Sequence, residues 1–206
     1  MKILLIGASG HIGQAVIAAL DGRHELITAG RHSGEVRLDI EDENSIIELF
    51  RRLPRLDAVA VATGGRNGHL APLSEMRAEH YRVGLESKLL GQVNTVLHGM
   101  DKLNDGGSFT LVGGVWDPQS IVPLFSNLYM VNGALEAFVV AAATELPRRQ
   151  RINLVAPLLL SESAPQYGHL LRGAPQVSAA EVARAYSLSI EGIQNGQIYR
   201  FGAGHG

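Results

Sequence analysis

The chain has 206 residues, with 18 lysines and arginines, 20 aspartates and glutamates, and no cysteine. This length suits one domain with a sizeable core, and a net charge of −2 provides no basic surface for nucleic acid or an acidic membrane. The absence of cysteine excludes disulfides, thiolate metal sites and cysteine nucleophiles, and it fits the reducing cytoplasm.

Short apolar runs and helical patterns alternate along the first half of the chain. Residues 3–6 form a continuous apolar run, which predicts a strand covered on both faces. No apolar run approaches the roughly 20 residues that span a bilayer. The next predicted elements are a helix over 12–20, strands over 25–29 and 36–38, a helix over 44–53, a strand over 57–62 and a long helix over 74–100.

The same alternation continues to the end of the chain. It predicts strands over 108–112, 152–155 and 197–201, and helices over 127–146 and 178–190. We therefore expect an α/β fold: one domain over 1–206, with a doubly wound parallel sheet (Rossmann fold) of about seven strands and helices on both faces. The segment 158–177 is expected to be a short lid over a small substrate.

The segment 7–13, with the sequence GASGHIG, is the most informative motif. It lies directly after the first predicted strand and opens the first helix, which is the context that a dinucleotide-binding loop requires. There, Gly7 permits the tight turn, Gly10 lets the backbone approach a pyrophosphate, and Gly13 allows close packing of helix and strand. The helix N-terminus supplies N–H groups for the phosphates. The alternative is a glycine-rich turn without a ligand.

The end of the second predicted strand bears on the choice of cofactor. A site for NAD places an acidic side chain there, whereas this chain has Gly30 followed by Arg31. A guanidinium can bind the 2′-phosphate of NADP with two hydrogen bonds. The sequence therefore favours NADP over NAD, unless Arg31 is a solvated surface residue.

Four further segments stand beside the glycine loop: LDI at 38–40, VATG at 61–64, NGALEAF at 132–138 and RINLVAP at 151–157. With them, nearly the whole chain resembles the short-chain dehydrogenase/reductase superfamily. The resemblance implies that Asp39 contacts adenine. It implies a cofactor site made of Gly7, Ser9, Gly10, His11, Ile12, Gly13, Arg31, His32, Ser33, Asp39, Ile40, Ala62, Thr63, Gly64, Lys88 and Pro157.

The residues that carry the family's reaction are missing from the matching positions. The family uses a serine, a Tyr-x-x-x-Lys pair on one helical face, and an asparagine on the preceding long helix. Here the lysine position holds Asn132, the tyrosine position Leu128 and the asparagine position Lys88, while the serine position, within LVGG at 111–114, holds glycine.

Two features still support catalysis. Lys88 and Asn132 look like an exchange in which lysine has moved to the neighbouring helix, and Tyr129 adjoins the lost tyrosine position. We therefore assign Tyr129 as proton donor and Asn132 as orienting group, and we expect Lys88 either to hold the nicotinamide ribose or to assist electrostatically. Alternatively, Tyr129 is a packed aromatic residue and Lys88 caps a polar pocket. Trp116 and Pro118 form either a substrate wall or ordinary packing.

These observations lead to two hypotheses from different classes. The first is an NADP(H)-dependent oxidoreductase acting on a small carbonyl or alcohol. The second is an NADP-binding regulatory or sensor protein that has lost the chemistry.

No histidine pair or carboxylate cluster has metal-ligand spacing, so no metal is expected. The helix over 127–146 is apolar nearly all round, which predicts a homo-oligomer, a dimer or a tetramer.

Overall fold

The computed structural model describes residues 1–64, 69–115 and 121–202. They contain a seven-stranded sheet in the order β3-β2-β1-β4-β5-β6-β7, in which every neighbouring pair is parallel. The strands are β1 (Lys2–Ile6), β2 (Glu25–Gly30), β3 (Val36–Arg37), β4 (Leu56–Val61), β5 (Leu103–Val112), β6 (Arg151–Pro157) and β7 (Ile198–Phe201). The predicted doubly wound Rossmann sheet is confirmed.

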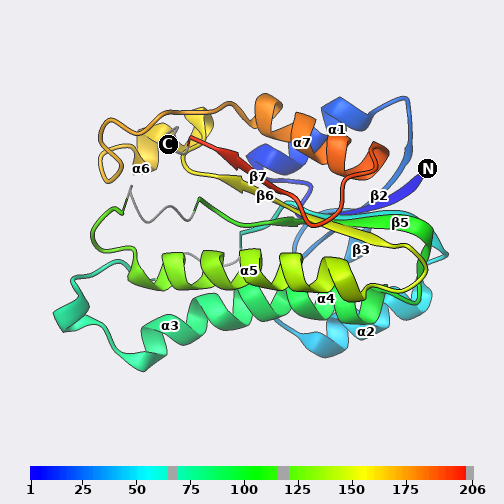
Figure 1. The fold of residues 1–206 in the computed structure, drawn as a ribbon, viewed down its shortest axis with the longest axis horizontal. Helices are drawn as coiled ribbons and strands as arrows, with labels where there is room; N and C mark the ends of the chain where they lie inside the picture. Colours follow the sequence, from blue (N-terminus) through cyan, green and yellow to red (C-terminus); the bar gives the residue numbers. More distant parts are fainter. Residues whose placement is uncertain (65–68, 116–120, 203–206) are drawn as a thin grey trace.

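Helices cover both faces of this sheet (Figure 1). On one face lie α1 (His11–Leu20) and α7 (Ala179–Glu191), and on the other lie α2 (Glu43–Arg52), α4 (Gly91–Gly99) and α5 (Ser126–Glu145). Side chains alternate along the central strands, so that Leu4 and Ile6 enter one core while Ile3 and Leu5 enter the other. Both faces of β1 are therefore buried, which explains why its sequence is a continuous apolar run.

The predicted helix over 74–100 is wrong in its start and in its continuity. A 3₁₀ turn, η1 (Leu73–Glu75), and two extended residues come first, and α3 (Ala78–Gly84) begins only where the His80 ring accepts a hydrogen bond from the Arg77 N–H. A π-helical segment, η2 (Leu85–Leu90), then separates α3 from α4.

The segment 158–177 contains η3 (Ser161–Ser163) and the short α6 (Ala164–Tyr167). In the parts of the chain that are described, no helix has the length and apolar character to cross a membrane.

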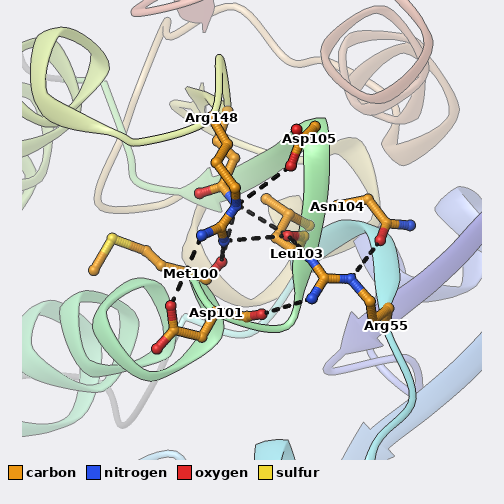
Figure 2. A network of polar contacts seen from close by, with 8 residues as sticks. Arg55, Met100, Asp101, Leu103, Asn104, Asp105 and Arg148 are labelled. Carbon is orange, nitrogen blue, oxygen red and sulfur yellow. Dashed lines mark hydrogen bonds and ion pairs between the residues drawn. The ribbon is translucent and has the colours of Figure 1, made fainter.

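Two arginines fix the amino-terminal end of β5, opposite the edge where the strands end (Figure 2). Arg148 donates to the Met100 and Leu103 carbonyl oxygens and lies 3.5 Å from a carboxylate oxygen of Asp105. Arg55 donates to the Leu103 carbonyl oxygen at 3.1 Å and to the Asn104 side chain at 2.9 Å. These bonds satisfy carbonyl groups at the turn into β5 and hold the strand in place.

We expect Arg148→Ala to lower the free energy of unfolding by about 1 kcal/mol, because two carbonyl groups lose a charged donor. The loss stays small since Gln150 donates to the same two carbonyl oxygens. Urea unfolding measures the change. Arg149→Ala is the matched control, because Arg148 and Arg149 share a left-handed backbone, with φ of 53° and 55°, and Arg149 is outside the network of Figure 2. Equal losses for the two variants would contradict this account.

Candidate active site

The glycine loop lies at the edge where the parallel strands end, and its shape depends on two glycines. Gly7 has φ of +88°, and a Cβ added there would lie 2.8 Å from the Thr63 Cβ. A Cβ on Gly13 would lie 2.2 Å from the Gly7 carbonyl oxygen. At Gly10 the nearest such atom is 3.8 Å away, and no side chain caps the N-terminus of α1. The loop therefore leaves backbone N–H groups and space for an anionic ligand.

A cavity of about 280 Å³ opens beside this loop. The predicted cofactor residues that the structure brings together around it are Gly7, Ser9, Arg31, His32, Ser33, Ile40 and Thr63. Glu41 also lines the cavity and was missed, because nothing in its local sequence indicates that its loop folds back toward Arg31.

Arg31 forms two ion pairs at this cavity. Its Nη2 lies 2.8 Å from Asp39 Oδ1 and 3.0 Å from Glu41 Oε1. The hydrogen bond that Arg31 donates to Asp39, and after it the one to Glu41, raises the pKa of Arg31 above its usual value. Asp39, which the resemblance assigns to adenine, thus holds Arg31 in place.

The other predicted cofactor residues lie around the loop in different ways. Ile12 packs against both cores, His11 is exposed at the start of α1, and Ala62 donates its N–H to the Ile6 carbonyl oxygen at 2.7 Å. Gly64 is exposed beyond β4, and Pro157 ends β6 beside a second cavity.

That second cavity, of about 180 Å³, brings together the three predicted catalytic residues. Lys88 comes from η2, while Tyr129 and Asn132 come from α5. Gly113 and Gly114, directly after β5, form another wall. Residues far apart in sequence therefore meet at one point of the sheet edge.

The Lys88 ammonium is largely withdrawn from water. Its Nζ donates to the Gly113 carbonyl oxygen at 3.2 Å. Burial lowers the pKa of Lys88 to about 8, because the charged form loses hydration. Lys88 can therefore change its charge close to neutral pH.

Asn132 lies against Gly114, within the segment that holds the family's serine position. A Cβ on Gly114 would lie 2.7 Å from Asn132 Nδ2, so a side chain there would require this amide to shift. Asn132 Oδ1 is buried and has no hydrogen-bond partner among the described residues. A buried acceptor of this kind is costly unless a ligand supplies the donor.

Tyr129 lies in the same cavity with its phenol group held by the backbone. Its hydroxyl oxygen accepts a hydrogen bond from the Val122 N–H at 3.0 Å, and its ring centre is 6.3 Å from that of Phe125. Leu128, which occupies the family's tyrosine position, also lines the cavity.

An apolar cavity of about 360 Å³ shares several walls with the second cavity, including Lys88, Phe125 and Leu128. From the segment 158–177 the cavity is lined by Leu158, Leu159, Leu160, Ser163, Tyr167 and Leu171. Among its described lining residues, Lys88 is the sole charged one. The predicted wall residues Trp116 and Pro118 lie outside the described residues. Within the described chain, no group of three histidine or acidic side chains is placed to hold a metal ion.

A Rossmann sheet of this order, with a glycine loop after β1, is the fold of the short-chain dehydrogenases/reductases, and the chain has that fold. It is similar to the protein lin1944 from Listeria innocua, with 44% identity over 97% of this chain and 98% of that chain and a TM-score of 0.92, and it belongs to the same family as that protein.

Two more distant structures share the fold. One is a small-chain dehydrogenase in complex with NADPH, with 24% identity over 98% of this chain and 96% of that chain and a TM-score of 0.85. The other is BdcA in complex with NADPH, with 18% identity over 100% of this chain and 96% of that chain and a TM-score of 0.84. No family model and no curated protein matches the chain.

Proposed function

We propose that the protein is an NADPH-dependent reductase of the short-chain dehydrogenase/reductase type that acts on a small, uncharged carbonyl compound, or on the alcohol in reverse. The observation that carries this proposal is the meeting of Lys88, Tyr129 and Asn132 around one cavity next to an apolar chamber. The leucine-rich lining favours an apolar substrate.

The residues at the sheet edge fit the cofactor. Gly7 and Gly13 shape a loop that no side chain caps, Arg31 offers a guanidinium to a 2′-phosphate, and Asn132 Oδ1 lacks a donor. Two structural neighbours were solved with NADPH. When bound, NADPH supplies the hydride that a carbonyl reduction needs.

The chain's own residues supply the proton and the electrostatics. As the carbonyl carbon gains hydride, its oxygen becomes negative, and the Tyr129 hydroxyl donates the proton that completes the alcohol. The Lys88 ammonium stabilises the charge left on the phenolate, and its effect is strengthened because Lys88 is largely withdrawn from water. Asn132 orients the bound ribose or substrate through its carbonyl oxygen.

The second candidate is an NADPH-binding regulatory protein without turnover. It is favoured by Asn132, Leu128, Lys88 and glycine at the family's four catalytic positions. A panel of small apolar aldehydes and ketones separates the two functions, because tight NADPH binding without NADPH oxidation supports only the second.

The choice of cofactor is tested at Arg31. We expect Arg31→Asp to weaken NADPH binding by about 1.5–3 kcal/mol relative to NADH, the free energy of a charged hydrogen bond. Titration calorimetry with both nucleotides measures the difference. Arg37→Asp, an equal charge change at an exposed position of β3, serves as the control and should not discriminate between them. Equal losses for NADPH and NADH in Arg31→Asp would refute the assignment.

The chemistry is tested at Lys88. We expect Lys88→Met to abolish turnover, and wild-type activity to fall as pH rises through about 8, where the ammonium loses its proton. Lys102→Met is the control, because Lys102 donates to the Leu53 carbonyl oxygen, away from the site.

Unfolding experiments test whether Lys88→Met loses turnover because it fails to fold. The pKa of Lys88 is lower in the folded than in the unfolded chain, so the wild type gains stability as pH rises from about 8 to the unfolded value near 10.4. Lys88→Met should lack this rise and should be no less stable than the wild type at pH 7. Full activity in Lys88→Met would overturn the mechanism.

We further propose a cytoplasmic homodimer that associates through α4 and α5, whose outer faces carry apolar side chains. Leu97 is 50% exposed and Val140 54% exposed. Sedimentation equilibrium at micromolar concentration should give twice the 22.1 kDa mass of one chain. Val140→Glu should produce monomers, whereas Leu188→Glu on α7, at a position 53% exposed, should not. A wild-type mass near 22.1 kDa would disprove the dimer.

A further inference from the structure

We infer that Gln92 is a positioning residue for Lys88, because its buried amide ties the helical turn that carries Lys88 to the last residue of β5. The functional part of this inference rests on the proposed role of Lys88, whereas the positioning itself stands on geometry alone.

The amide of Gln92 is fully buried and makes three hydrogen bonds. Its Nε2 donates to the Lys88 carbonyl oxygen at 2.9 Å and to the Val112 carbonyl oxygen at 2.8 Å. Its Oε1 accepts from the Val112 N–H at 2.8 Å. One side chain thus binds both backbone groups of Val112 and the backbone of Lys88.

The Lys88 side chain also binds this strand end. Its Nζ donates to Gly113, the residue that follows Val112. Lys88 and Gln92 are one helical turn apart, and they bind two successive residues at the end of β5. The position of the ammonium therefore depends on how firmly the backbone at Lys88 is held against this strand end.

The helical turn that carries Lys88 is irregular. At the end of η2, the N–H of Gly91, the first residue of α4, donates to the Glu86 carbonyl oxygen five residues earlier, as in a π-helix. Single π-turns are rare inside helices and are frequent at functional sites. Gly91 also lets the helix pack closely against the backbone of Ile40, since a Cβ on Gly91 would lie 2.6 Å from the Ile40 carbonyl oxygen. Gly91 and Gln92 thus fix the helix directly after Lys88.

Loss of the amide should release the ammonium toward water. Gln92→Leu leaves both backbone groups of Val112 and the Lys88 carbonyl oxygen without this partner, so the π-turn relaxes. Rehydration favours the charged amine, and the pKa of Lys88 then rises toward its ordinary value. The titratable side chains that line the two cavities with Lys88, among the described residues, are Tyr129 on α5 and Tyr167 on α6.

The experiment observes Lys88 directly. The chain contains three lysines, Lys2, Lys88 and Lys102, so protein labelled with ¹³C-lysine gives three Cε signals, and Lys88→Met assigns one of them. In the wild type the Lys88 signal should titrate near pH 8. We expect its midpoint to rise by at least one pH unit in Gln92→Leu and also in Gln92→Met, an uncharged side chain of similar length that lacks both the donor and the acceptor.

Thr95→Val is the matched control. Thr95 is buried on the same helix and donates to the Gly91 carbonyl oxygen at 2.8 Å, so the variant loses a buried hydrogen bond without touching β5. Its Lys88 midpoint should stay at the wild-type value. An unchanged midpoint in either folded Gln92 variant, or an equal rise in Thr95→Val, would overturn the inference.

Turnover supplies a second, separable readout. If the proposed reductase activity is found, Gln92→Leu should lower kcat at least tenfold while the KM for NADPH changes less than twofold. A wild type without turnover refutes the proposed function. The lysine titration still decides the positioning role in that case.

Discussion

An ammonium group withdrawn from water must be given acceptors by its surroundings, and the centre of the site is arranged around this requirement. The Gly113 carbonyl oxygen accepts from Lys88, and the Gly113 N–H donates to the Val155 carbonyl oxygen at 2.9 Å. The pairing of β5 with β6 therefore sets where the acceptor lies. The parallel sheet thus determines the position of a charge that comes from a helix on its face.

The departures from the family pattern meet at one cavity. Lysine stands on η2, an amide stands on α5, and the end of that amide lies 2.7 Å from where a Cβ on Gly114 would be. A side chain at Gly114 would therefore require the Asn132 amide to shift. This proximity fits the proposal that the serine, lysine and asparagine positions changed together.

Local signals in the sequence predicted the strands and the glycine loop, because apolar runs and glycine spacing report directly on backbone geometry. The helix over 74–100 was predicted with the wrong start, since its apolar spacing extends across a 3₁₀ turn and two extended residues. The apolar spacing also gave no sign of the π-turn between α3 and α4. The role of Gln92 depends on Val112, twenty residues away, and a single sequence does not reveal that contact. The structure places Tyr129, Lys88 and Asn132 around one cavity, and their catalytic roles stay a prediction.

The energetics of Lys88 fit the proposed reductase chemistry. Burying an ammonium costs stability, and an apolar side chain of similar length avoids that cost. Lys88 nevertheless stands as a charge beside a leucine-lined chamber of about 360 Å³. A reductase would gain a great deal, because the same low polarity that makes the charge costly strengthens its attraction for the negative charge that develops during reduction.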